Sequence, residues 1–359
     1  MCAIFKSVKR LSMYGVKMST RTTIKDIARA TGVSASTVSL VLNGKDQRIS
    51  EKTRRHVVQV ANELEYEPNQ LAVGLITQRS HTLGLIIPDV SNTFFSEIAK
   101  GAEEEAFSAG YNIILCNTND QASRDVKYMN LLLGRNVDGI ALTISSPQQG
   151  TENKACQKLL ELSQKPAVLI DRIRMGDKTS SIMVDHLHGG FLATKHLIDQ
   201  GHRKIGCITG SMRLYTASLR FQGYKKALEQ SGIPLNMDWV EHGHYHLEDG
   251  ERLAERLMRR GVTAIFACND LMAYGVYRVA KRLGVSIPDD LSVVGFDNLL
   301  FSDLVDPPLT TVAQGANEIG TRAIRKLIAL VENRDEQNES IRFEPYLVTR
   351  KSVKERSYS

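Results

Sequence analysis

The pattern of apolar positions along this chain changes near residue 80. Before it, apolar residues recur three and four positions apart, as at Ile24, Ile27 and Ala28, which predicts short amphipathic helices. After it, short apolar runs bounded by turn residues alternate with helical stretches, which is typical of parallel sheets with crossover helices. The runs fall at residues 83–88, 112–116, 139–144, 167–170, 204–209, 264–267 and 291–295. We therefore predict an all-α head followed by an α/β region.

Residues 23–43 predict two helices joined by a tight turn. Thr23 can cap the first helix together with Asp26 three residues later. Gly32 suits the corner because glycine takes a positive φ at little cost, and Ser34 can cap the second helix. We expect a third helix to begin at Ser50 and to close a small core. Its expected core side chains are Val57, Val60, Ala61 and Leu64.

A helix that follows such a turn is the element that many regulators place in the major groove of DNA. The charge pattern agrees, since residues 1–79 hold 13 basic and 6 acidic side chains, whereas the rest holds 33 basic and 34 acidic. A helical bundle without a ligand is the alternative. The residues that we expect to contact DNA from this head are Thr23, Ser34, Ala35, Ser36, Thr37, Ser39, Leu40 and Asn43.

Residues 23–43 resemble the helix-turn-helix of the lactose-repressor/galactose-repressor family of bacterial transcription regulators. The run Tyr-Glu-Pro-Asn-Gln-Leu-Ala-Val-Gly-Leu at 66–75 is similar to that family's hinge helix, and the resemblance covers nearly the whole chain after Met18. It implies DNA contacts from Asn69, Ala72 and Leu75, with Leu75 wedged between base pairs in the minor groove. A helix of about two turns is marginal by itself, which fits a hinge that forms only on operator DNA.

Polar side chains follow the predicted strands of the second region. About 270 residues after position 80 favour two α/β lobes, and ligands of such sheets bind beyond the carboxyl ends of the strands. Carboxylates and guanidiniums hold vicinal hydroxyl groups, and aromatic rings cover the apolar face of a sugar. Alternatively, Asp171 and Arg172 form a surface ion pair, and Phe94 and Phe95 belong to the core. The candidate residues are Asn92, Phe94, Phe95, Asp171, Arg172, Arg220, Asn269, Asp297 and Gln314.

The resemblance places these residues, together with Tyr245, in the cleft of the family and of the related periplasmic sugar-binding proteins. The Asp171–Arg172 pair with Asn269, Asp297 and Gln314 resembles a pentose site, that of ribose in particular. Ser218 departs from the ribose-binding relatives, which often have a second arginine there. Hexose and purine or nucleoside effectors therefore stay as alternatives, and so does a corepressor in place of an inducer.

The remaining chemistry argues against other classes of protein. Five cysteines form no C-x-x-C pair, which indicates a reducing, cytoplasmic compartment without a metal cluster. His242, His244 and His246 alternate, but no acidic or cysteine partner has metal-ligand spacing. The chain has neither a phosphate-loop motif nor a G-x-S-x-G nucleophile motif, so we expect no enzyme and no cofactor. No apolar stretch approaches the roughly 18 residues that span a bilayer, and no signal peptide is expected, which disfavours a membrane protein and a transport receptor.

The predicted organisation is that of a homodimeric, ligand-responsive repressor that binds a near-palindromic operator. Residues 1–18 form a basic extension, or precede a true start at Met18. The expected parts are a helix-turn-helix domain at 19–65, a hinge at 66–79, a two-lobed effector-binding and dimerisation domain at 80–350, and a tail at 351–359. The run 306–311, which contains two prolines, predicts a crossover between the lobes.

Overall fold

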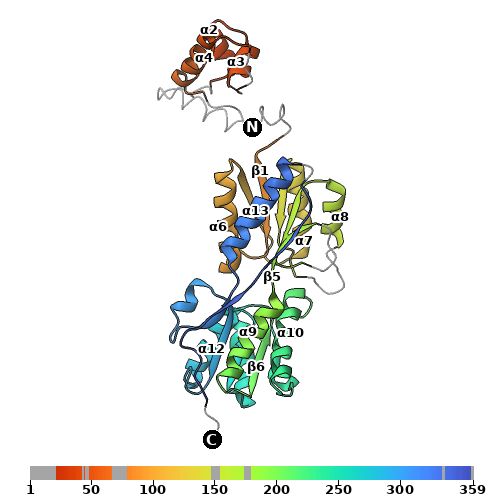
Figure 1. Cartoon of the computed structure of the whole chain (residues 1–359), viewed down its shortest axis with the longest axis vertical. Coiled ribbons are helices and arrows are strands. Elements are labelled where there is room, and N and C mark those ends of the chain that lie inside the picture. The colour runs from red at the N-terminus through yellow and green to blue at the C-terminus, as the bar shows by residue number, and fades with distance from the viewer. Residues whose placement is uncertain are drawn as a thin grey trace, which may run out of the picture. The chain divides into compact units, whose positions relative to one another are not determined.

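The computed structural model describes residues 22–42, 44, 48–66, 79–146, 154–173, 179–333 and 336–356. The chain divides into two compact units, Met1–Gln78 and Arg79–Ser359, which we call the head and the sensor (Figure 1). The predicted DNA contacts Asn43, Asn69, Ala72 and Leu75 lie outside the described residues, as does the extension at 1–18. Among the described residues, the helices are too short or too polar to cross a membrane.

The head consists of the three predicted helices, α2 (Ile24–Thr31), α3 (Ala35–Leu42) and α4 (Glu51–Glu63). The backbone N–H and the hydroxyl of Thr23 donate to one oxygen of Asp26, at 3.0 and 2.7 Å. Gly32 takes a φ of 70° at the corner, and the hydroxyl of Ser34 accepts a hydrogen bond from the Thr37 N–H at 3.1 Å. The predicted helix-turn-helix is confirmed.

Six apolar side chains from the three helices form the core of the head: Ile27, Val38, Val41, Val57, Val60 and Ala61. The prediction for Leu64 is wrong, because its side chain is 38% exposed. Leu64 follows the last turn of α4 as its capping residue, and the partly buried Tyr66 packs against the core instead. The Leu64 carbonyl accepts a hydrogen bond from the Thr22 hydroxyl at 2.9 Å, which ties the two ends of the described head together.

The sensor contains two six-stranded sheets, one in each lobe. The first lobe has the order β11-β5-β4-β3-β1-β2 and is parallel throughout. The second has the order β12-β10-β9-β8-β6-β7, in which β12 alone runs antiparallel to its neighbour. In the first lobe the strands are β1 (Thr82–Ile87), β2 (Asn112–Asn117), β3 (Gly139–Leu142), β4 (Ala167–Ile170), β5 (Ser180–Val184) and β11 (Ser340–Phe343). In the second they are β6 (Ile205–Thr209), β7 (Val240–His242), β8 (Ala264–Ala267), β9 (Ser292–Asp297), β10 (Thr310–Ala313) and β12 (Tyr346–Val348).

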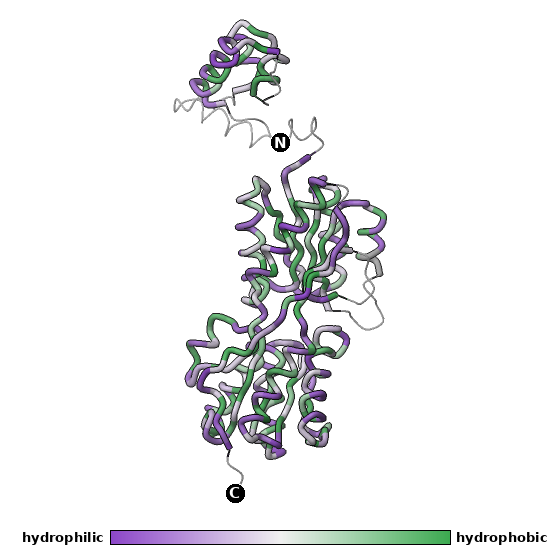
Figure 2. Tube along the Cα trace, in the orientation of Figure 1, coloured by the Kyte–Doolittle hydropathy of each residue, from purple (hydrophilic) through white to green (hydrophobic). Residues whose placement is uncertain are grey.

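Helices cover both faces of the first sheet (Figure 1). Leu83, Leu85 and Ile87 of β1 pack with α6 (Thr93–Ser108) and α13 (Ala316–Glu332). Ile86 faces the other way, toward α7 (Ala122–Gly134) and α8 (Lys154–Ser163). The alternation follows from the two-residue period of a strand. Figure 2 shows the hydrophobic residues gathered in the strands and the hydrophilic ones along the outer helices.

The second lobe is built from two helix pairs around its sheet. One pair is α9 (His186–Asp199) with α10 (Tyr215–Gln230), and the other is α11 (Leu247–Arg259) with α12 (Asp270–Leu283). Gly190 of α9 lets the two helices of the first pair approach closely, because a Cβ there would lie 2.1 Å from the Arg220 carbonyl oxygen. This contact brings Arg220 beside the first turn of α9.

The chain passes between the lobes after β5, after β10 and after β11, since each of these strands is followed by an element of the other lobe. The prediction of a crossover at 306–311 is therefore wrong. That segment leads into β10, which pairs with β9 in the second sheet, and the crossover follows one strand later. Residues 351–356 run along the second lobe, where Ser352 and Val293 exchange hydrogen bonds and the Arg356 N–H donates to Gln200 O at 2.8 Å.

Candidate effector site and DNA-contacting surface

Two candidate carboxylates stand at strand ends with an unusual backbone. Asp171 follows β4 with a φ of 61°, and Asp297 ends β9 with a φ of 117°. Residues other than glycine rarely adopt a positive φ. Such strained backbone is found mostly at functional sites, where the surrounding structure holds it in place. Both residues are buried, at 4% and 7% exposure.

A buried histidine connects Asp171 of the first lobe to Arg220 of the second. His186 is the first residue of α9 and is fully buried. Its Nε2 lies 2.9 Å from Asp171 Oδ1, and its Nδ1 accepts a hydrogen bond from Arg220 Nε at 3.3 Å. The sequence did not indicate His186, because β5, the strand directly before it, begins with two serines and was not recognised.

Arg220 is the centre of the candidate residues in the second lobe. Its Nη1 donates to the Cys268 carbonyl at 2.5 Å and lies 3.7 Å from Asp297 Oδ1. Its guanidinium carbon is 3.8 Å from the ring centroid of Phe296 and 5.7 Å from that of Tyr245. Gln314 Nε2 donates to Asp297 Oδ1 at 2.5 Å. The structure thus brings Asp171, Arg220, Tyr245, Asp297 and Gln314 into one cluster, which we call the effector cluster.

The pKa values of the two carboxyl groups of this cluster are shifted in opposite directions. Burial by itself would raise the pKa of Asp171, but His186, Arg220 and Arg172 together outweigh it, so the pKa of Asp171 is lowered. Burial raises the pKa of Asp297 well above its usual range, and Arg220 opposes this shift only in part. Asp171 is therefore an ionised acceptor, whereas Asp297 retains its proton to a higher pH.

Two polar atoms of the effector cluster are buried without a hydrogen-bond partner among the described residues. They are the Tyr245 hydroxyl and Gln314 Oε1. Tyr245 itself is tightly held, because a Cβ at Gly210 would lie 2.1 Å from its ring carbon Cζ. An unpaired buried polar group costs about 1–3 kcal/mol, so both atoms are suited to hydrogen-bond a polar ligand.

Arg172 forms a second group of contacts in the first lobe. Its Nη1 lies 2.5 Å from Asp120 Oδ1, and its guanidinium carbon is 5.4 Å from the Phe95 ring centroid. Asp120 also accepts from the backbone N–H and the hydroxyl of Ser146, at 2.8 and 2.5 Å. Burial raises the pKa of Asp120, but Arg172 and Ser146 outweigh it and lower the pKa overall. The sequence did not indicate Asp120, because its partners Arg172 and Ser146 are 52 and 26 residues away in the chain.

Three other candidates have structural contacts in their own lobes. The Asn92 side chain caps α6 by accepting from the Phe94 N–H at 3.1 Å. The Asn269 side chain caps α12 at the Met272 N–H and donates to the Tyr245 carbonyl at 3.2 Å. Phe94 is 3% exposed and packs in the core of the first lobe, edge-on to Phe95 at 5.1 Å. The structure therefore uses these side chains in capping and packing.

The head presents a small and weakly polar surface at the start of α3. Ser34, Ala35 and Ser36 are exposed, and Leu40 is 43% exposed. Thr23 is exposed as well, whereas Thr37 and Ser39 are half-buried. Val38 and Val41 point into the core, so the exposed residues are those of the opposite face of α3.

Comparisons with known proteins agree with this architecture. Residues 23–69 match the bacterial regulatory proteins of the lacI family, and residues 194–353 match the periplasmic binding protein-like domain. The chain is 35% identical over 337 residues to the HTH-type transcriptional repressor PurR of Pasteurella multocida (strain Pm70), over 93% of this chain and 99% of that protein. The chain belongs to the lacI family. It is a DNA-binding transcriptional repressor and not an enzyme, as the sequence predicted.

Two solved structures of lacI-family proteins are similar along the chain. The lac repressor dimer bound to operator and the anti-inducer ONPF is 25% identical, with a TM-score of 0.82 over 93% of this chain and 99% of that one. A LacI family regulator from Enterococcus faecium with bound ribose is 27% identical, with a TM-score of 0.70 over 77% of this chain and 100% of that one. The predicted fold class is confirmed.

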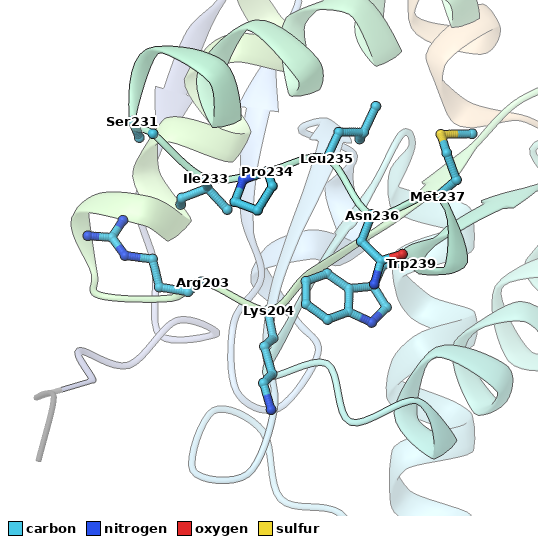
Figure 3. A pocket seen from close by; sticks show the side chains of 10 residues that line it. Arg203, Lys204, Ser231, Ile233, Pro234, Leu235, Asn236, Met237 and Trp239 are labelled. Carbon is cyan, nitrogen blue, oxygen red and sulfur yellow. The ribbon is translucent and has the colours of Figure 1, made fainter.

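The lacI-family sensor also has a pocket of about 510 Å³ outside the effector cluster (Figure 3). Figure 3 shows its wall, which consists of Arg203, Lys204, the segment from Ser231 to Met237, and Trp239. Arg203 and Lys204 precede β6, so this pocket lies at the amino end of that strand. The effector cluster lies at the carboxyl ends, and the pocket contains none of its residues.

The remaining histidines and cysteines of this lacI-family chain form no metal site among the described residues. Among the described residues, no three His, Cys, Asp or Glu side chains are arranged to hold a metal ion. His242 Nδ1 hydrogen-bonds to the Thr209 hydroxyl at 2.7 Å. The described thiols are free and buried, and the sulfur atoms of Cys207 and Cys268 are 4.0 Å apart.

Proposed function

We propose that this lacI-family repressor acts as a homodimer on a near-palindromic operator and is released from it by a pentose-like sugar, with ribose as the first candidate. The observation that carries the proposal is the effector cluster. It gathers charged groups from both lobes, and two of its buried polar atoms have no hydrogen-bond partner among the described residues.

The effector cluster offers the functional groups that a polyol needs. A sugar hydroxyl both donates and accepts, so it can bridge a carboxylate such as Asp171 and a guanidinium such as Arg220. The Tyr245 hydroxyl and the Gln314 carbonyl supply a further donor and acceptor. The Phe95 ring is 4% exposed, packs in the core of the first lobe and lies 5.4 Å from the Arg172 guanidinium carbon; only the resemblance makes it a candidate for the apolar face of the sugar ring.

Contacts from both lobes supply the coupling to DNA. An effector that bonds to Asp171 and Arg220 at once favours one arrangement of the lobes over another, because each lobe contributes part of the site. The coupling is reciprocal, so operator DNA must change the affinity for the sugar by the same factor as the sugar changes the affinity for the operator. We propose that the hinge at 66–79 transmits this change to the head.

An effector panel tests the proposal. Purified protein is titrated calorimetrically with D-ribose, other pentoses, hexoses, purine bases and nucleosides, each with and without operator DNA. We expect D-ribose to bind and to weaken operator binding. Binding of a purine alone, or of a hexose alone, would overturn the pentose assignment, and an effector that tightens operator binding would make the protein a corepressor-dependent regulator.

Asp297→Ala separates a role in the effector site from a structural role. Asp297 is buried in the second lobe and lies in the sensor unit. We expect this variant to lose its response to the sugar while it binds operator like the wild type. Loss of both activities would instead assign Asp297 to the stability of the fold.

For the DNA contacts, we propose that the exposed face of α3 reads base edges, with Ser34, Ala35, Ser36 and Leu40 foremost. Thr23, Thr37 and Ser39 flank that face, and the resemblance adds Asn43, Asn69, Ala72 and Leu75. Small residues such as Ala35 offer few bidentate hydrogen bonds, so apolar contact and groove shape would carry much of the specificity.

Leu40→Ala tests this surface. We expect about a 10-fold loss of specific operator affinity at constant salt, since one poorly matched base contact typically costs about 1–3 kcal/mol. Leu131→Ala is a matched control, because Leu131 is a leucine of similar exposure in the sensor, at 42% against 43%. Equal operator affinities for the two variants would exclude Leu40 from the interface.

A further inference from the structure

His186 is placed where the two lobes join. It begins α9 directly after the chain leaves β5 of the first lobe, and its side chain is fully buried. One ring nitrogen contacts Asp171 of the first lobe, and the other contacts Arg220 of the second. A side chain in this position is linked to both halves of the effector cluster.

The contacts of His186 define its tautomer. Arg220 Nε always carries a hydrogen and can only donate, so His186 Nδ1 must accept and carries no proton. The proton of the neutral ring is therefore on Nε2, which donates to Asp171 Oδ1. Burial lowers the pKa of His186, and Asp171 opposes this only in part, which agrees with a neutral ring.

The bonds of His186 leave one carboxylate oxygen of Asp171 and one guanidinium nitrogen of Arg220 for a ligand. His186 occupies Oδ1 of Asp171 and Nε of Arg220, and the Cys268 carbonyl engages Nη1 of Arg220. Oδ2 of Asp171 and Nη2 of Arg220 have no hydrogen bond to the described residues. An acceptor of the first lobe and a donor of the second are thus held in a definite orientation by one ring.

We propose that His186 is a positioning residue of the effector site, which orients Asp171 and Arg220 across the two lobes and thereby sets the affinity for the effector. The inference rests on the proposed function, in which the effector cluster binds the ligand. A neutral imidazole is suited to this role because it bonds to both partners without neutralising Asp171 or repelling Arg220. A cationic residue here would do both.

Three variants separate the two bonds of His186. In His186→Asn the side-chain oxygen can take the place of Nδ1 and keep the bond to Arg220. In His186→Gln the side-chain amide can reach the place of Nε2 and keep the bond to Asp171. His186→Leu keeps neither. His188→Leu is the control, because His188 lies on the same turn of α9, is half-buried and stacks on Phe191 at 6.4 Å, outside the effector cluster.

The affinity for D-ribose, measured by calorimetry, is the first readout. We expect His186→Leu to weaken it about 100-fold and His186→Asn and His186→Gln about 10-fold each, since hydrogen bonds to charged groups contribute at this level. His188→Leu should keep the wild-type ribose affinity and the wild-type operator affinity without sugar. Wild-type ribose affinity in Asn and Gln variants that have lost thermal stability would overturn the proposal, because His186 would then be a packing residue only.

A ligand-free readout keeps this test distinct from that of the proposed function. If the wild type does not bind D-ribose, the pentose assignment fails, and ¹⁵N NMR of the imidazole in the free protein still tests His186. We expect a neutral ring protonated at Nε2, and we expect Asp171→Asn to change its Nε2 resonance. A ring protonated at Nδ1, or at both nitrogens, would overturn the inference whatever the effector is.

Discussion

The two arginines of the candidate site differ in how they are held. Arg172, whose own side chain is 10% exposed, pairs with Asp120, whose side chain is 37% exposed, and both belong to the first lobe. Arg220 and Asp297 have side chains that are 6% and 5% exposed, and Arg220 also bonds to His186 and to the Cys268 carbonyl. Exposed ion pairs are screened by water, whereas breaking a buried pair leaves a charge without a partner. We therefore expect Arg220 to support the fold as well as the candidate site, and Arg172 to contribute less to the fold.

The carboxyl partners of the two arginines differ in their pKa values. The pKa of Asp120 is lowered because Arg172 and Ser146 outweigh the effect of burial. The pKa of Asp297 is raised because burial outweighs Arg220, which lies 3.7 Å away. A well-formed pair near solvent stabilises the carboxylate, whereas a looser pair in the interior does not.

Arg220→Met should have the largest effect. It leaves Asp171 and Asp297 without the guanidinium, so we expect ribose affinity to fall at least about 100-fold, as for the loss of several charged hydrogen bonds. The free energy of unfolding in urea should fall by about 3–5 kcal/mol, the typical cost of breaking a buried pair. Arg220→Lys keeps the charge but not the planar fork, so it should recover stability more than affinity. Recovery of affinity alone would contradict the scaffold role.

Arg172→Met should have a smaller and more selective effect. We expect ribose affinity to fall about 10-fold, while the free energy of unfolding changes by less than about 1 kcal/mol, as for a partly exposed pair. The same calorimetry and urea titrations measure both quantities. If Arg172→Met were as destabilising as Arg220→Met, the distinction between the two arginines would be lost.

The smallest effect concerns the pH dependence of stability. Asp120 has a lowered folded pKa, so its contribution is present above the unfolded pKa and is lost as the pH falls through the folded value. Asp297 has a raised folded pKa, so its contribution is present below the unfolded pKa and is lost as the pH rises through the folded value. The measurement is the melting temperature as a function of pH. Asp120→Asn should flatten this curve below the unfolded pKa of an aspartate, and Asp297→Asn should flatten it above that pKa. Identical curves for the two variants would show that the pKa shifts of Asp120 and Asp297 do not have opposite signs.

Much of the fold could be predicted because its patterns are local. The helix-turn-helix rests on Thr23, Gly32 and Ser34, whose caps and turn lie within a few residues of each other. All seven apolar runs of the sensor are strands in the structure. The strands that were not predicted, β5, β7, β10, β11 and β12, are short or polar, so their burial depends on neighbours that are distant in the chain.

The sequence by itself determined the helical head, the two α/β lobes and the residue types at the strand ends, because periodicity and capping act over a few residues. Only the tertiary structure decided which of those residues meet. Asp171, His186, Arg220 and Asp297 lie on four different elements, and parallel strands with crossover helices bring them within hydrogen-bond or ion-pair distance. His186 and Asp120 have no local signal, since their roles come from partners 34 and 52 residues away in the chain.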